Sequence, residues 1–139
     1  MKDFTKFTCF AMRVTMKKLE KHLAERFEGL GINILQSFIL ISLMEKDGST
    51  LTEVSNRAMI ENSSLTTLVD RLERDGLVVR RMDGQDRRAI RLYLTESGNA
   101  LAEKALQALA EFNWHLKNRL GGLEDPFLKG LSAVSESLD

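Results

Sequence analysis

The chain has 139 residues, of which 43% are hydrophobic and 29% charged, and twenty basic side chains balance twenty acidic ones. This composition fits one packed domain and excludes a disordered chain. Because the overall charge is neutral, a site for a polyanion has to come from local clustering of basic residues.

Cysteine and histidine are too sparse for a disulfide framework or a structural metal site. Cys9 is the single cysteine, and His22 and His115 stand far apart, without cysteine partners at metal-ligand spacing. No stretch approaches the roughly 20 apolar residues of a membrane span, and the first residues carry no apolar run of signal-peptide type. These features predict a cytoplasmic, reduced protein with no metal, no cofactor and no membrane contact.

The N-terminal third predicts two helices. Residues 4–28 carry apolar side chains at helical spacing with lysines between them, and Gly29 and Gly31 end this pattern. Residues 32–45 are apolar on most sides of a second helix. Such a helix belongs in the centre of a small domain, so we expect residues 32–45 to form its core.

Two short helices joined by a tight turn follow. Thr50 and Glu53 form a capping-box pattern at the start of the first, and Gly76 ends the second, which runs over about 63–75. The second helix has an apolar stripe on one face and small hydroxyl side chains on the other, which suit entry into the major groove of DNA. The predicted DNA contacts on this helix are Ser63, Ser64, Thr66, Thr67 and Arg71.

A β-hairpin is predicted after Gly76, because the apolar period changes from 3.6 to 2. Five arginines stand between Leu77 and Thr95 against two aspartates, so the hairpin is basic within a neutral chain. Arginine at a protruding loop suits a narrow, electronegative minor groove. Asp86 is expected to support the wing by pairing with one of the arginines and fixing the shape of the tip. The predicted DNA contacts of the hairpin are Arg81, Arg87 and Arg88.

The remaining residues predict two more helices. Thr95 caps the first, over about 96–119, and Pro126 fits the first turn of the second, after the break at Gly121-Gly122. The two ends of the chain carry more apolar side chains than one small domain can bury. Large apolar patches mark interfaces, which indicates a dimer.

Two segments of this sequence resemble the MarR family. Residues 86–98, DRRAIRLYLTESG, are similar to the family's wing signature, in which Asp-x-Arg precedes an apolar-x-Leu-Thr-x-x-Gly run. Residues 65–78, LTTLVDRLERDGLV, resemble its recognition helix and the exit into the wing. The order of helices and the length agree as well, so the resemblance covers essentially the whole chain. The chain departs from the common pattern at Thr67, where family members often carry arginine.

The resemblance implies a mainly α fold with a small β-hairpin wing: a winged helix-turn-helix with about six helices. We expect a single domain over 1–139, with its winged core at about 32–95 and dimerisation helices at about 4–28 and 96–138. The implied function is a bacterial transcriptional repressor that binds an inverted-repeat operator in double-stranded DNA as a homodimer. A small aromatic or phenolic effector would release it.

The wing arginines have two alternative roles that the residues alone leave open. One of Arg87 and Arg88 should enter the minor groove, and the other should pair with Asp86. The Asp-x-Arg spacing of the family favours Arg88 as the structural partner and Arg87 as the free side chain.

An effector pocket has candidate residues in Met12, Met16, Trp114 and His115, although such residues at helical spacing are more often core or dimer contacts. Cys9 faintly resembles the cysteine of peroxide-sensing family members. However, the only tyrosine lies in the wing, and the sequence places no cation to activate the thiol. We therefore expect Cys9 to be a buried small hydrophobe and not a redox sensor.

Two other functions compete with DNA binding. A winged-helix protein-interaction module would suit the neutral charge and Thr67, but it leaves the basic wing without a purpose. An enzyme would need a nucleophile–base pair, a metal triad or a phosphate loop. The sequence assembles none of these, so we do not expect an enzyme.

Overall fold

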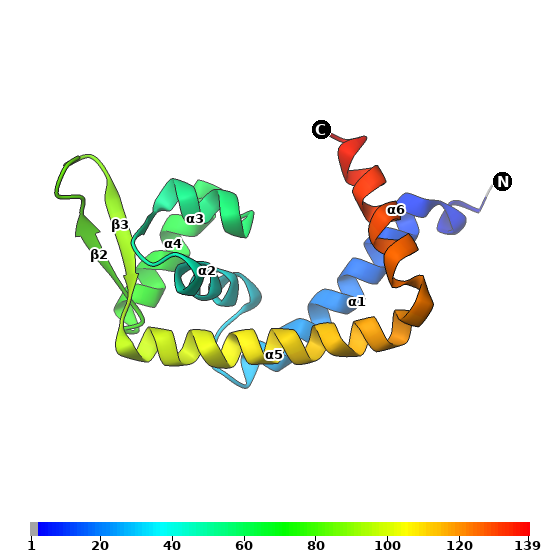
Figure 1. The fold of residues 1–139 in the computed structure, drawn as a ribbon, viewed down its shortest axis with the longest axis horizontal. Helices are drawn as coiled ribbons and strands as arrows, with labels where there is room; N and C mark the ends of the chain where they lie inside the picture. Colours follow the sequence, from blue (N-terminus) through cyan, green and yellow to red (C-terminus); the bar gives the residue numbers. More distant parts are fainter. Residues whose placement is uncertain (1–2) are drawn as a thin grey trace. The chain divides into compact units, whose positions relative to one another are not determined.

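The computed structural model describes residues 3–139, which form two compact units, one ending at Ala108 and the other spanning Leu109–Asp139 (Figure 1). The first unit holds most of the secondary structure, and α5 runs from the first unit into the second. In chain order the elements are η1 (Phe4–Lys6), α1 (Thr8–Glu28), α2 (Ile34–Glu45), β1 (Ser49–Thr50), α3 (Leu51–Ala58), α4 (Asn62–Arg74), β2 (Val78–Met82), β3 (Ile90–Leu94), α5 (Glu96–Leu120), η2 (Gly121–Leu123) and α6 (Glu124–Glu136). The mainly helical fold with a small β-hairpin is confirmed.

The first helix begins later than predicted. A 3-10 turn, η1, precedes it, and the Asp3 carboxylate caps this turn by accepting the Thr5 N–H at 3.1 Å. Phe7 is then extended, with φ −73° and ψ 139°, so α1 starts anew at Thr8. The apolar residues of the sequence nevertheless keep their helical spacing across this break. The Phe4 ring, before the break, meets the edge of the Phe10 ring, after it, with centroids 5.0 Å apart. The periodic pattern of the sequence therefore could not reveal the break.

The second helix, α2, is the core of the first unit, as predicted. Ile39, Leu40 and Leu43 are fully buried in it. The helix begins at Ile34 because Asn33 and Gln36 form a reciprocal capping box: the Gln36 N–H donates to Asn33 Oδ1 at 2.8 Å, and the Asn33 N–H donates to Gln36 Oε1 at 3.0 Å. The sequence reading missed this cap.

The next two helices meet at a tight turn. Thr50 and Glu53 form the predicted capping box at the start of α3, with the Glu53 N–H donating to Thr50 Oγ1 at 3.2 Å. Met59 closes α3 in the left-handed region, with φ +54°, which is unusual for a residue other than glycine. Gly76 adopts φ +73° after α4, as expected of a residue that ends a helix.

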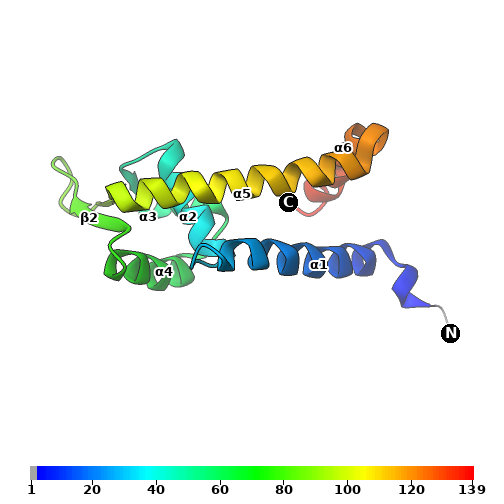
Figure 2. The same ribbon diagram turned by 90° about the horizontal axis from the view of Figure 1, so that it is seen from below.

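The hairpin belongs to a three-stranded antiparallel sheet with the order β1-β3-β2. Val78 pairs with Leu94 and Met82 with Ile90 in the β2–β3 register, and Ser49 of β1 pairs with Leu92 of β3. The two-residue strand β1 is too short to show a period, so the sequence did not predict it. The hairpin tip projects away from α2, α3 and α4 in both ribbon views (Figures 1 and 2).

The start of α5 is tied to the end of α4. Thr95 Oγ1 accepts the Gly98 N–H at 3.0 Å, which confirms the predicted cap, and the same hydroxyl donates to the Gly76 carbonyl at 2.6 Å. Gly98 packs so closely against Leu77 that an added Cβ would lie 1.9 Å from the Leu77 carbonyl oxygen. The recognition-helix exit, the wing and α5 therefore share one tightly packed junction.

The second unit contains the last part of α5, η2 and α6. Pro126 lies in the first turn of α6, as predicted. The apolar side chains of this unit are largely exposed; Phe127 is 46% exposed and Leu128 52%. No helix within residues 3–139 is long and apolar enough to cross a membrane.

Candidate nucleic-acid interface

One face of α4 is buried and the opposite face is open to solvent. Leu65, Val69 and Leu72 are fully buried. The predicted contacts Ser63, Ser64, Thr66, Thr67 and Arg71 are all exposed on this helix. With 100° between successive residues, Ser63 and Thr67 lie near the centre of the outward face. Ser64 and Arg71 lie on one flank of this face, and Thr66 lies on the other.

The outward hydroxyls and the start of α4 keep free hydrogen-bonding capacity. Thr66 Oγ1 donates to the Asn62 carbonyl at 3.0 Å and Thr67 Oγ1 to the Ser63 carbonyl at 3.5 Å, which leaves both hydroxyl oxygens able to accept. In the described part of the chain, no side chain caps the N-terminus of α4. Its first amides can therefore face an anion such as a DNA phosphate.

Arg80 joins the recognition helix to the wing. Its guanidinium contacts the Asp70 carboxylate and lies 3.5 Å from Glu73 Oε1, and its backbone N–H donates to Glu73 Oε2 at 3.2 Å. Asp70 lies on the outward face of α4, where a DNA phosphate would repel an unpaired carboxylate. Arg80 therefore compensates this charge and fixes β2 beside α4, a role that the sequence reading did not find.

A second ion pair lies where the two strands of the wing meet its tip loop. Arg91 Nε donates to Asp83 Oδ2 at 2.9 Å, and Arg91 Nη1 donates to the Gly48 carbonyl at 2.8 Å. The Gln85 N–H, which donates to Asp83 Oδ1 at 3.0 Å, and the Arg91 guanidinium hold the pKa of the Asp83 carboxyl below its ordinary value. Arg91 thus links the wing to the loop before β1.

Asp86 supports the tip of the wing, but through a different partner from the one predicted. Its Oδ1 accepts the backbone N–H of Arg88 at 2.9 Å, and its carbonyl accepts the Ala89 N–H at 3.1 Å. Within residues 3–139, no ion pair joins Asp86 to Arg87 or Arg88, so the predicted side-chain pairing is wrong. A backbone amide two residues ahead is already within reach of an aspartate in a turn, whereas a guanidinium must be ordered at an entropic cost.

The ion pairs divide the five wing arginines into two groups. Arg80 and Arg91 are held by carboxylates. The other three form no ion pair with the described residues, and they are the predicted DNA contacts Arg81, Arg87 and Arg88. The guanidinium of Arg81 lies over the Tyr93 ring, 5.3 Å from its centroid. These three cations lie on β2 and at the exposed tip.

Arg57 is another structural arginine that the sequence reading missed. Its Nη1 donates to the Ser42 carbonyl at 2.7 Å and to Ser42 Oγ at 2.8 Å, and its Nη2 donates to Ser49 Oγ at 3.1 Å. It therefore joins α3 to the end of α2 and to β1. Ser42, within the apolar run of α2, was the sequence signal for a buried polar contact.

Two of the effector candidates, Trp114 and His115, line an open hollow of about 440 Å³ within the second unit, together with Ala110 and Glu111. In the first unit, Met12 is half-buried and Met16 is exposed on α1. In the second, Trp114 is 60% exposed and meets the ring of His115 edge-on, at 5.2 Å between centroids. An effector site at Met12, Met16, Trp114 and His115 stays a prediction.

Cys9 is exposed on α1, so its expected burial is wrong for the chain as described. The side of α1 that carries Cys9 is not covered by the residues around it in the first unit. Within residues 3–139, no three His, Cys, Asp or Glu side chains gather as metal ligands would.

Asp83→Asn is expected to loosen the wing and leave the helical core intact. Asparagine can still accept the Gln85 N–H, but it loses the charge that pairs with Arg91. Amide exchange in peptides covering residues 83–90 should accelerate, whereas peptides from α2 should be unchanged. Because the pKa of Asp83 is lowered in the folded state, the ionised Asp83 carboxylate stabilises the wing at pH values above the ordinary carboxyl pKa. This stabilisation is lost as the pH falls through the lowered pKa of the folded state.

Hydrogen exchange followed by mass spectrometry checks this prediction across an acidic pH series. Asp75→Asn is the control, because Asp75 is an exposed carboxylate outside the wing. If peptides covering residues 83–90 exchange their amide hydrogens equally fast in Asp83→Asn and Asp75→Asn, the Asp83–Arg91 pair does not order the wing.

Two short helices with an exposed hydroxyl face, followed by an arginine-bearing hairpin, define a winged helix-turn-helix protein. The MarR family model matches residues 32–90. The HTH-type transcriptional repressor YetL of Bacillus subtilis (strain 168) is 30% identical over 125 residues, covering 88% of this chain and 75% of that protein. The chain belongs to the MarR family of transcriptional regulators.

Two further comparisons agree with this assignment. The HTH-type transcriptional repressor MdtR of Bacillus subtilis (strain 168) is 30% identical over 96 residues, or 69% of this chain; the match spans only 62% of that protein. The structure of the S. aureus MepR–DNA complex superimposes with a TM-score of 0.87 at 25% identity, covering 96% of this chain and 100% of that one.

Proposed function

We propose that this protein is a homodimeric transcriptional repressor, which binds an inverted-repeat operator in double-stranded DNA and works in the cytoplasm. The proposal rests on two features that occur together. The outward face of α4 carries exposed hydroxyl groups, and three arginines of the adjoining wing form no ion pair with the described residues. Arg80 compensates the acidic groups of α4 at the same face. The names of YetL and MdtR support repression.

The proposed contacts fall into two groups with separate roles. Ser63 and Thr67 read or approach the major groove, while the amides at the start of α4 meet a phosphate. One tip arginine enters the minor groove and Arg81 lies nearer the backbone. Ser64, Thr66 and Arg71, on the flanks of α4, are proposed only as peripheral contacts.

The dimer is proposed to form through the terminal helices, at about 4–28 and 96–138. Each unit by itself supports this: Phe4 and Phe7 are 59% and 52% exposed in the first, and Leu123 is 67% exposed in the second. Exposed apolar groups of this size mark an interface. A second copy of this chain would cover them and place two recognition helices on one DNA face.

The protein is expected to be a stable dimer at micromolar concentration and to bind half-sites about one helical turn, roughly 10 base pairs, apart. Affinity for the operator should fall steeply with salt, because phosphate contacts release counterions. Sedimentation velocity measures the first property. Fluorescence anisotropy measures the second, on operators found by selection from genomic fragments and on a random duplex of equal length.

A monomer in solution, or sites that occur singly, would contradict the proposed dimeric reading of DNA. The alternative function, a protein-interaction module, predicts no salt-dependent binding to any duplex. Release of the protein from its operator by an effector is a further part of the proposal. A small ligand would shift one recognition helix relative to the other, and two half-sites at a fixed spacing on DNA would then no longer fit both helices.

A further inference from the structure

An open hollow of about 430 Å³ lies between the start of α2 and the start of α4, within the first unit. It is lined by Leu35 from α2 and by Ser63, Ser64, Thr67 and Leu68 from α4. Ser63 and Thr67 also lie near the centre of the outward face of α4. The hollow is therefore continuous with the face of α4 that is proposed to read DNA.

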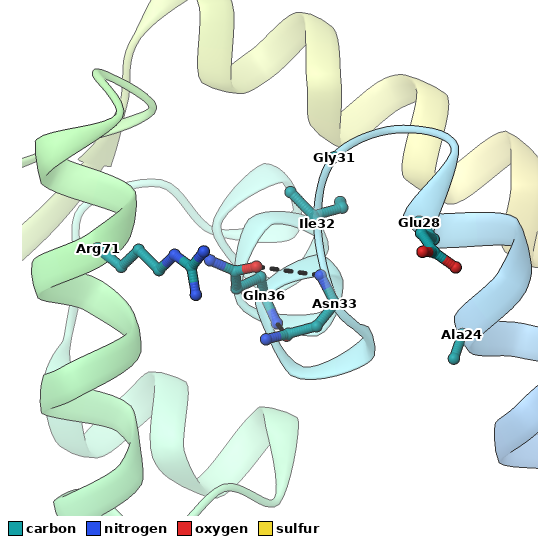
Figure 3. Close-up of a pocket in the computed structure, with 7 residues that line it drawn as sticks. All are labelled: Ala24, Glu28, Gly31, Ile32, Asn33, Gln36 and Arg71. Carbon is teal, nitrogen blue, oxygen red and sulfur yellow. Dashed lines mark hydrogen bonds between the residues drawn. The ribbon is translucent and has the colours of Figure 1, made fainter.

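One wall of the hollow is apolar and fixed in position. Leu35 is 40% exposed, and Leu68, which lines the same hollow, is half-buried. Leu35 lies between the two residues of the α2 capping box, in which Gln36 Oε1 accepts the Asn33 N–H at 3.0 Å (Figure 3). The start of α2 therefore holds an exposed leucine beside the recognition helix.

Thr67 can add a methyl group to this apolar wall. Its Oγ1 donates to the Ser63 carbonyl at 3.5 Å. Because the helix backbone takes the hydroxyl proton, the γ-methyl is the part of Thr67 that is left for an apolar partner.

The hollow has no charge with which to hold a phosphate. Of the described residues, none that carries a charge lines it. Arg71 lies on the same flank of α4, but its side chain lines a different pocket and extends towards Gln36 (Figure 3). Since phosphate contacts gain most from lysine and arginine, this hollow suits a neutral, apolar group of DNA.

Hydroxyl donors border the apolar wall. The side chains of Ser63 and Ser64 donate no hydrogen bond to a described residue. Each hydroxyl can therefore donate to an acceptor on DNA. In the major groove thymine presents its O4 acceptor next to its 5-methyl group, and none of the other three bases presents a methyl group there.

We propose that the hollow recognises a thymine of the operator. The 5-methyl group contacts Leu35, Leu68 and the γ-methyl of Thr67, while the thymine O4 accepts a hydrogen bond from the Ser63 hydroxyl. This assignment rests on the proposed function, because it names a base that the α4 face reads. It also makes Leu35 a specificity-determining residue, although Leu35 lies outside the recognition helix.

Replacing thymine by deoxyuridine tests the methyl contact, because deoxyuridine keeps O4 and the base pair and lacks only the 5-methyl group. In operators selected from genomic fragments, each thymine of a half-site is replaced in turn, and fluorescence anisotropy measures the affinity of the full chain. At one position, deoxyuridine should weaken wild-type binding about fourfold, the loss expected for one buried methyl group. The loss should exceed about tenfold when both half-sites carry the replacement.

Two variants of the wall should remove this dependence on the methyl group. Leu35→Ala and Thr67→Ser each take apolar atoms from the hollow, so the ratio of thymine to deoxyuridine affinity should fall towards one at that position. Ser63→Ala should weaken binding to both duplexes alike, since both present O4. Thr66→Ser is the matched control: it removes the same methyl group on the other flank of α4, and the ratio should keep its wild-type value.

Three results would overturn the assignment. In the first, deoxyuridine leaves wild-type affinity unchanged at every thymine, or the ratio survives in both Leu35→Ala and Thr67→Ser. In the second, Leu35→Ala weakens binding although the wild-type ratio is one, which assigns the hollow to a deoxyribose. In the third, Leu35→Ala sediments as a monomer, which assigns Leu35 to the contact between two copies.

The same measurements separate this assignment from the proposed function. Operator binding without any dependence on a thymine methyl group contradicts only the assignment of the hollow. Failure of every selected fragment to bind contradicts the proposed function, and the assignment falls with it.

Discussion

Replacing Gly98 with alanine is expected to destabilise the protein by about 3 kcal/mol or more, because overpacking against a rigid neighbour forces the backbone to move. The added Cβ would lie 1.9 Å from the Leu77 carbonyl oxygen and 2.9 Å from its carbon. Leu77 cannot yield freely, since its carbonyl accepts the Thr95 N–H at 3.1 Å and its N–H donates to the Leu72 carbonyl at 2.9 Å. The displacement would spread to the end of α4, the start of the wing and the α5 cap.

Gly130→Ala is the matched control, because this glycine also lies in a helix and an added Cβ meets nothing within 4 Å. Alanine there should be neutral or should stabilise by about 0.5–1 kcal/mol, through the lower entropy of the unfolded chain. Urea unfolding of both variants at one protein concentration gives the comparison, since the stability of a dimer depends on concentration. Equal stability of the two variants would show that the close approach at Leu77 is relieved without cost.

The local features of the fold were largely predictable from the sequence. The Thr50–Glu53 box, the αL glycine at Gly76 and the period change at Leu77 each arise from a few adjacent residues, and each is present in the structure. The two-residue strand β1 and the break at Phe7 were missed. Periodicity detects neither, because the first is too short and the second leaves the apolar pattern intact.

The partners of charged side chains were not predictable, because they come from residues distant in sequence. Arg91 reaches the Gly48 carbonyl across 43 positions, and Arg80 reaches Asp70 across ten. The sequence shows five arginines in the wing. It does not show that two of them form ion pairs that hold the wing in place, nor that the other three form no ion pair with the described residues. Asp86 shows the same limit: its supporting role was foreseen, and its partner was not.

The tip arginines are expected to contribute unequally to operator binding. Arg88 donates its backbone N–H to the Asp86 carboxylate. Arg88 also lines a shallow groove, together with Thr50, Leu51 and Thr52 at the start of α3. Arg87 is exposed and lies outside this groove. We therefore expect Arg87 to be the side chain that enters the minor groove, where a confined guanidinium meets a strong negative potential.

Arg87→Ala is expected to cost about 1–3 kcal/mol of operator affinity, by analogy with other arginine contacts to DNA. Arg88→Ala should weaken binding to operator and random duplex more evenly and flatten the salt slope by about one unit, as expected for the loss of a phosphate-neutralising charge. Asp86→Ala should act differently. It removes a negative charge near DNA, yet it should weaken operator binding, because the Arg88 N–H loses the acceptor that shapes the tip.

Fluorescence anisotropy across a salt series, with operator and random duplexes, separates these three effects. Arg13→Ala is the control for losing one positive charge, because Arg13 lies on α1, outside the winged core. Sedimentation should give the same dimer for the three wing variants, since the wing lies outside the terminal helices proposed to form it. If operator affinity is unchanged in both tip-arginine variants, the wing does not contact the operator, and the protein-interaction alternative becomes the better account of the exposed cations.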